Sequence, residues 1–304
     1  KIPLPNRKAL LEKYGSSGRG SSSPTAIASV AFDVLNNRVL DAQLEPISVD
    51  ERTLAIRHME NIKSKARTNL LYTMFVFDRG YASKNLISYI EDTIHASYLF
   101  RLRTKFNTDI DAVPAPLEQN GISDSILILD GRKIRVIKFY LPSGILETLI
   151  TNDFELDKEN FRQCYFLRWP VEENYKLIKE KIGLINFRGY SENSILQEFW
   201  ISMLLANLSL AIKRETDGII DSTINQKGNK NKYMTNMNEL IGYLSRHFGE
   251  YMDADTLTQK FDIILSIFDF AISHRVQDKK GSGVSSPRTV PRKVKHHYNN
   301  KTTH

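Results

Sequence analysis

The sequence predicts an α/β fold that carries a β-strand insert and ends in a mostly helical portion. The apolar run 70–77 has the composition of a central strand buried on both faces, and it ends at Asp78. A helical segment, 83–94, begins at a capping serine, and the strand-like run 97–103 follows it directly. A strand, a helix and a second strand in this order are typical of an α/β core.

The segments before and after this core support the same fold class. Residues 25–47 form two β-branched runs that meet at Asn36-Asn37, which predicts a hairpin. Residues 50–65 have helical spacing and an acidic start. Beyond the insert the chain is nearly all helical, and the predicted helices are 158–182, 192–213, 235–248 and 255–274.

The alternation of strands and helices is interrupted between about residues 104 and 156. Three strand-like runs follow one another there, separated at Asp130-Gly131 and at Pro142-Ser143-Gly144, which predicts a β meander without a helix of its own. The predicted organisation is a first part of the α/β core, the β insert, a helical part and a basic tail, with the boundaries 1–103, 104–156, 157–276 and 277–304.

Charge and composition restrict the class of protein. The net charge is +7, and residues 277–304 contain seven Lys and Arg against one Asp, so the tail carries nearly all of the excess. This tail is predicted to be disordered until it meets nucleic acid, or else to be an inert solubilising end. The longest apolar run, 199–212, is shorter than the roughly 20 residues of a membrane span and predicts a buried helix and no membrane partner. The single cysteine, Cys164, excludes an intrachain disulfide and fits a reducing cytoplasm.

Asp78 is the first candidate for chemistry. It follows a buried strand, and ligands of open α/β sheets bind at the carboxyl ends of strands, so its carboxylate is a candidate metal ligand or base. The alternative is a purely local role in an Asp-Arg-Gly turn, with Arg79 as its neighbour.

A second candidate is the stretch 164–184, in which Tyr165, Arg168, Glu172 and Lys179 recur at offsets of three, seven and fourteen. On a regular helix these offsets fall within roughly 60° of one another, so the four side chains would share one face. Such a face suits a phosphate and a metal, although mixed Lys/Glu faces are also common on solvated helices. Pro170 indicates a kink or two separate helices.

Together, the motifs "DRGY" at 78–81 and "RWPVEENYKLIK" at 168–179 resemble the DDE transposases of bacterial insertion sequences, over about residues 1–275. The closest resemblance is to the cut-and-paste group with the Tyr-Arg-Glu-Lys signature, often called insertion sequence family four. It implies a ribonuclease-H-like mixed sheet with a β insert before the helix of the catalytic glutamate.

The resemblance also implies roles for individual residues. Asp78 and Glu172 resemble the second aspartate and the glutamate that hold Mg²⁺, or Mn²⁺ in its place, in a site where two ions activate water and stabilise the leaving oxygen. Tyr165, Arg168 and Lys179 would bind DNA phosphates, with help from Arg79 and from Arg101.

Three details depart from the pattern of the family. The first aspartate is expected ahead of Lys1, so this chain alone is expected to lack efficient cleavage, and Asp33 is a weaker substitute. In relatives that form a DNA hairpin, an aromatic residue of the β insert grips a flipped base. The β insert here has no Trp, so Phe139 or Tyr140 would have to take that role. Trp169, beside the signature, could stack on a base or belong to the core.

The expected function is therefore metal-dependent DNA cleavage and strand transfer at the ends of an insertion sequence. The expected partners are the double-stranded terminal inverted repeats and the target DNA, bound by a dimer, at the nucleoid in the bacterial cytoplasm. Two alternatives remain open: a noncatalytic DNA-binding protein or decayed transposase, and a structure-specific nuclease without strand transfer.

Overall fold

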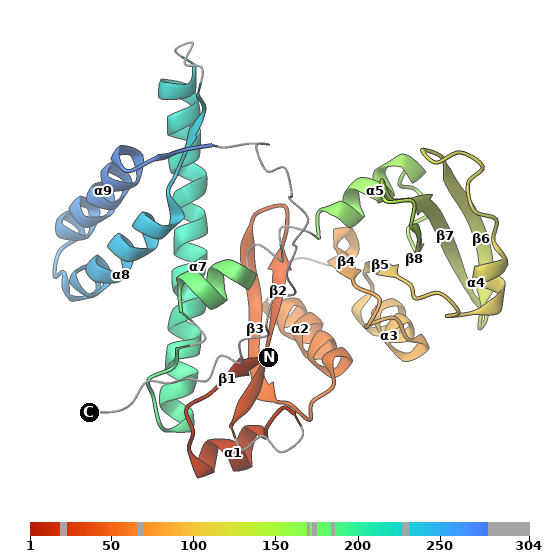
Figure 1. Ribbon diagram of the computed structural model, residues 1–304, viewed down its shortest axis with the longest axis horizontal. Coiled ribbons are helices and arrows are strands. Elements are labelled where there is room, and N and C mark those ends of the chain that lie inside the picture. Colours follow the sequence, from red (N-terminus) through yellow and green to blue (C-terminus); the bar gives the residue numbers. More distant parts are fainter. Residues whose placement is uncertain are drawn as a thin grey trace, which may run out of the picture. The chain divides into compact units, whose positions relative to one another are not determined.

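The computed structural model describes residues 1–18, 23–65, 70–168, 171, 175–183, 186–226 and 231–278. The chain divides into two compact units, and each unit is assembled from separate segments (Figure 1). The first comprises Lys1–Ala28, Asn36–Ser48 and Glu173–His304, and the second comprises Ser29–Leu35 and Val49–Glu172. Residues 279–304 of the basic tail lie outside the described residues, as do Trp169 and Glu172. The predicted domain boundaries stay a prediction.

The first unit contains a small sheet with the strand order β1-β2-β3. Its strands are β1 (Ile2–Pro3), β2 (Thr25–Asp33), whose last residues belong to the second unit, and β3 (Arg38–Pro46). The predicted hairpin between the last two strands is confirmed, and Asn37 adopts a left-handed conformation with φ 53°, which asparagine tolerates well. The short helix α1 (Lys8–Tyr14) follows β1.

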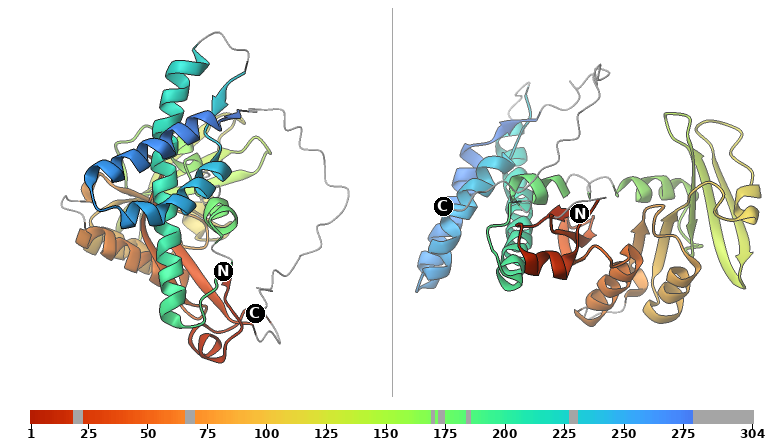
Figure 2. Two further views of the ribbon diagram at one scale, coloured as in Figure 1. Left: turned by 90° about the vertical axis from the view of Figure 1, so that its left-hand side faces the viewer. Right: turned by 60° about the horizontal axis from the view of Figure 1, so that its bottom comes forward.

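Helices make up the rest of the first unit. They are the π-helical turn η3 (Leu177–Lys181), the long helix α7 (Glu192–Ile220) with its continuation η4 (Asp221–Asn225), α8 (Met237–Asp253) and α9 (Leu257–Ser273). The short strands β9 (Tyr233–Met234) and β10 (Val276–Gln277) pair with each other. Figures 1 and 2 show α8 and α9 side by side against α7.

Helix α7 is longer than the predicted helix 192–213. By length and composition alone, the span Glu192–Asn225 could cross a membrane, a property that core helices of soluble proteins share. It contacts β3 through Asn207, whose side-chain amide accepts from the N–H of Val39 at 2.7 Å and donates to its carbonyl at 2.9 Å. The expected burial is only partly correct, because Trp200 on this helix is 51% exposed.

The second unit is built on a five-stranded mixed sheet with the order β4-β5-β8-β7-β6 (Figure 1). Its strands are β4 (Met74–Phe77), β5 (Ser97–Arg101), β6 (Ile122–Leu129), β7 (Arg132–Tyr140) and β8 (Leu146–Thr151). The first two are parallel, as the strand-helix-strand pattern predicts, and the other pairs are antiparallel. The predicted meander is thus present, and through β8 it continues the sheet of the core.

Strand β4 differs from the prediction. It lies at the edge of the described sheet, and all four of its residues are partly exposed, so the prediction of a central strand buried on both faces is wrong. The first residues of the apolar run, Leu70–Tyr72, form the 3-10 turn η1 instead. An apolar run indicates that both faces of a strand are apolar, but it does not give the number of neighbouring strands.

Helices cover the two faces of this sheet differently. The helices of the unit are α2 (Glu51–Lys65), α3 (Lys84–Tyr89) with the π-helical turn η2 (Ile90–Ile94), α4 (Thr108–Ala112) and α5 (Lys158–Phe166). Tyr98 and Phe100 pack with the side chains of α3 and η2, whereas Leu99, which points to the other face, packs against Phe161 and Tyr165 of α5. The predicted cap of α3 is confirmed, because the Ser83 hydroxyl accepts from the N–H of Leu86.

Two helical predictions are corrected. The insert does contain a helix, α4, which begins at the capping side chain of Asn107 and whose last carbonyls accept from the buried ammonium of Lys138. The predicted helix 158–182 is interrupted, because α5 ends at Phe166, four residues before Pro170. The interruption agrees with the kink that Pro170 indicated.

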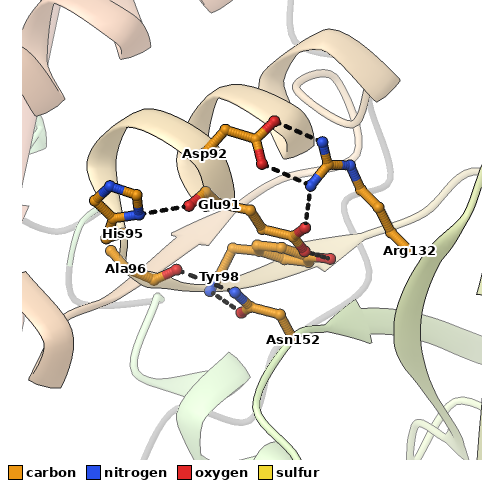
Figure 3. A network of polar contacts seen from close by, with 7 residues as sticks. All are labelled: Glu91, Asp92, His95, Ala96, Tyr98, Arg132 and Asn152. Carbon is orange, nitrogen blue, oxygen red and sulfur yellow. Dashed lines mark hydrogen bonds and ion pairs between the residues drawn. The ribbon is translucent and has the colours of Figure 1, made fainter.

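A polar network fastens the meander to the helical layer (Figure 3). Arg132, at the start of β7, donates to Glu91 at 2.7 Å and, through two nitrogens, to Asp92 at 2.9 and 2.5 Å. The hydroxyl of Tyr98 donates to Glu91, and the side chain of Asn152 accepts from the N–H of Tyr98. Burial raises the pKa of Tyr98 far above its ordinary value, so the phenol stays a donor.

Candidate active site

The register of two parallel strands brings Asp78 and Arg101 together. Phe77 is paired with Phe100, so Asp78 and Arg101 are the next residues along their strands. Side chains alternate along a strand, and Met74 and Val76 pack on the α5 side of the sheet, so Asp78 points to that side too. The Arg101 Nη1 atom lies 3.6 Å from Asp78 Oδ1.

The Asp78 carboxylate is partly engaged and partly accessible. Its Oδ1 atom accepts from the N–H of Arg79 at 2.8 Å, which confirms a role in the local turn. Arg52 of α2 supports this turn by donating to the carbonyl of Gly80 at 3.2 Å. The side chain is nevertheless 43% exposed, and within the described residues both of its polar contacts fall on Oδ1. The Oδ2 atom is therefore available to a ligand.

Strand β8 adds a buried carboxylate. Because β8 runs antiparallel to β5, its first residues lie beside the last residues of β5, and Leu149 is paired with Arg101. Glu147, two residues earlier on the same face, accepts from Arg101 Nε at 2.5 Å and from Nη2. Its side chain is only 3% exposed. Burial by itself lowers the pKa of Arg101, but the hydrogen bonds and charge of Glu147, with smaller contributions from Tyr165 and Asp78, raise it on balance.

Tyr165 lies close to two guanidinium groups. The Cζ atoms of Arg101 and Arg168 are 5.8 and 5.7 Å from its ring centroid, within the range of cation–π contacts. The residue is 3% exposed and belongs to the core cluster around Phe161. Its hydroxyl makes no hydrogen bond among the described residues, so the ring is fixed by packing and not by its polar tip.

For the remaining predicted residues the structure shows other surroundings or none. Arg79 is exposed, and its side chain makes no hydrogen bond or ion pair with the described residues. Lys179 lies in η3 of the first unit, with its Nζ 5.6 Å from the ring centroid of Tyr175. Glu172 lies outside the described residues, so the shared helix face of the four signature residues stays a prediction.

Two other candidates have local explanations. Asp33 ends β2, and its Oδ1 accepts from the N–H of Leu35, as in an Asx turn. Of the two residues predicted to grip a flipped base, Phe139 is 0% exposed in the core under α5 and is therefore ruled out. Side chains alternate between the two faces of β7, and that of Phe139 points into the core. The sequence Phe139-Tyr140 does not reveal which of the two side chains points inward. Tyr140, next along the strand, is partly exposed.

Glu147 is the residue that the sequence did not suggest. A signal was present, since Glu147 is the one charged residue of β8. Its partner, however, is 46 residues away along the chain. The two residues meet only because β8 pairs with β5 in the sheet. Among the described residues no group of three acidic, His or Cys side chains gathers to hold a metal ion.

These features define an accessible carboxylate at the end of a strand, with an arginine beside it, in a mixed α/β fold. The chain matches the family model "Transposase DDE domain" over residues 3–208. Because this match covers well over half of the chain, the chain belongs to the transposase DDE domain family.

Similarity to solved structures is weaker. The chain resembles the piggyBac transposase of a synaptic complex with hairpin DNA, determined by cryo-electron microscopy, with a TM-score of 0.45 and 10% sequence identity. The similarity covers 89% of this chain and 55% of that one, so this chain spans about half the length of the piggyBac chain. A search among curated proteins gave no match.

Proposed function

We propose that this chain is the catalytic part of a cut-and-paste DDE transposase of the bacterial group with the Tyr-Arg-Glu-Lys signature, on a ribonuclease-H-like core. It would cleave DNA at the ends of its insertion sequence and join the freed ends to target DNA. One observation carries the proposal: in a chain of the transposase DDE domain family, the accessible carboxylate of Asp78 lies beside Arg101, which in turn lies over Tyr165.

Asp78 and Glu172 are the proposed ligands of Mg²⁺, or of Mn²⁺. The geometry of Asp78 fits this role, because Oδ2 has no contact within the described residues and the carboxylate is open to solvent. Mg²⁺ prefers oxygen ligands and keeps several waters, so few carboxylates are needed. When bound, a pair of such ions supplies a hydroxide at neutral pH and stabilises the leaving oxygen of the phosphodiester.

Four further side chains would hold the DNA. Arg168, whose guanidinium lies over Tyr165, can donate two parallel hydrogen bonds to a phosphate. Arg79 extends from the turn that follows Asp78 and is free to reach the backbone of the DNA. The Tyr165 hydroxyl and the ammonium of Lys179 are the other proposed phosphate ligands, the latter as a point charge.

The proposed partners are the terminal inverted repeats of the element and a target duplex, bound by two copies of the protein. The basic residues beyond 278 would add affinity that is independent of DNA sequence. The proposed location is the nucleoid of a bacterial cytoplasm.

The test uses the full-length product of the gene that encodes this chain, with linear DNA that carries the repeats flanking that gene. The wild-type protein should cut at the repeat and join the 3′ end to a plasmid in the presence of Mg²⁺. Glu172→Gln should abolish cutting and leave binding to the repeat unchanged, and the matched control Glu173→Gln should still cut.

Three results would contradict the proposal. Wild-type protein that binds without cutting would be a noncatalytic DNA-binding protein. Wild-type protein that cuts without joining would be a nuclease. Cutting by Glu172→Gln would refute the assignment of the glutamate.

A further inference from the structure

Glu147 is a buried charge that the proposed chemistry does not use. A carboxylate that is 3% exposed is costly unless it is paired, and its partner is Arg101, itself 15% exposed. Arg101 also faces Asp78. The guanidinium is thus shared by two carboxylates, one buried and one accessible.

The sharing is unequal. Glu147 takes Nε and Nη2, the pair of donors along one edge of the fork, and this bidentate contact fixes the plane of the guanidinium. Only Nη1 remains on the side of Asp78, and it stays 3.6 Å from Oδ1, beyond a normal hydrogen bond. Arg101 therefore orients the Asp78 carboxylate without closing on it.

Charge explains why this restraint matters. Asp78, Arg101 and Glu147 together carry one net negative charge, which attracts a cation to the accessible carboxylate. Without the charge of Glu147 the guanidinium could turn and form its own bidentate pair with Asp78. That pair would be neutral and would occupy the oxygen that a metal needs.

We propose that Glu147 is a positioning residue, which holds Arg101 away from Asp78 and so keeps the Asp78 carboxylate available to a divalent cation. The inference rests on the proposed function, because it takes Asp78 as a metal ligand. It assigns to the β insert a part in building the metal site.

The test measures metal binding without DNA or turnover. Fe²⁺ with ascorbate and peroxide generates hydroxyl radicals that cut a protein backbone near a bound iron, and Mg²⁺ competes with the iron for the site. In full-length wild-type protein we expect cutting near residue 78. Glu147→Gln should raise the Fe²⁺ concentration for half-maximal cutting by about tenfold or more, as expected when a nearby charge is lost at a partly screened site.

Two further variants separate positioning from folding. Asp124 forms another bidentate pair of the same sheet, with Arg135, and this pair does not touch Asp78. Asp124→Asn should therefore leave the Fe²⁺ concentration for half-maximal cutting, the midpoint, unchanged. The double variant Arg101→Gln/Glu147→Gln should return the midpoint toward the wild-type value, because no guanidinium is left to compete. Thermal unfolding of each variant checks that it folds.

The outcomes distinguish the inference from the function beneath it. A wild-type protein that is not cut near residue 78 would overturn the metal site and the inference with it. A wild-type protein that is cut, together with an unchanged midpoint in Glu147→Gln, would overturn the inference alone. A double variant that binds metal more weakly than Glu147→Gln would show that Arg101 supports the metal and does not compete with it.

Discussion

Tyr165 fills the core under α5 and is also a proposed phosphate ligand through its hydroxyl, and substitutions can separate the two roles. The residue is 3% exposed, and its ring centroid lies 5.8 Å from the Cζ atom of Arg101 and 5.7 Å from that of Arg168. Tyr165→Ala removes a ring that buries about 200 Å² of aromatic surface, and at about 25 cal/mol per Å² this burial stabilises the fold by about 5 kcal/mol. Large-to-small aromatic substitutions in cores typically cost about 3–5 kcal/mol, so we expect Tyr165→Ala to lower the free energy of unfolding by about that amount.

Tyr165→Phe should behave differently, because it keeps the ring and removes only a hydroxyl that makes no hydrogen bond to the described residues. We expect its free energy of unfolding, from urea denaturation, to change by less than about 1 kcal/mol. If the hydroxyl binds a phosphate, the affinity for end DNA measured by fluorescence anisotropy should fall about five- to tenfold. Tyr72→Phe is the control, since Tyr72 is fully exposed.

Two results would refute this reasoning about Tyr165. An alanine variant as stable as the wild type would show that the ring is not a packing element. A phenylalanine variant that binds DNA as well as the wild type would remove Tyr165 from the phosphate ligands and leave it as a spacer for the two arginines.

Three other predictions concern single contacts. Hydrogen bonding to Arg132 lowers the pKa of Asp92, so the stabilisation that the ionised Asp92 gives is complete above its ordinary pKa of 3.8 and is lost as the pH falls through the lowered pKa. The difference in melting temperature between the wild type and Asp92→Asn should therefore shrink in that pH range. A constant difference would contradict this prediction. Asn207→Ala leaves the N–H and carbonyl of Val39 without partners and should lower the free energy of unfolding by about 1–3 kcal/mol, measured by urea denaturation; an unchanged value would mean that water replaces the amide. Deleting 279–304 removes seven cations and should flatten the salt dependence of DNA binding, by about 0.9 in log-log slope for each lost phosphate contact, and an equal slope would make the tail an inert end.

Local signals in the sequence predicted the parts of this fold that depend on local interactions. Ser83 caps its helix because a serine hydroxyl satisfies an orphan N–H wherever the helix begins. Asn37 allows the hairpin because asparagine tolerates the left-handed conformation. Asp78 ends a strand because the apolar run ends there, and its accessibility follows from that position.

The failures concern interactions between distant segments. The edge position of β4 depends on which strands join the sheet, and an apolar run carries no such information. Helix α4 is too short for a periodic pattern, and it depends on Lys138, which arrives from β7 to cap its carbonyls. The burial of Phe139 depends on which face of β7 meets α5, and a one-residue change of register would reverse it.

The β insert is more than an addition to the core. Since β8 pairs with β5, its register decides whether Glu147 faces Arg101, and a slip of one residue would turn the carboxylate to the opposite face of the sheet. Arg101 would then be a partly buried cation whose nearest anion is Asp78, the carboxylate that the proposed chemistry needs. An insert that only decorated the core could be shortened without consequence, whereas this one supplies the counter-charge on which the geometry beside Asp78 depends.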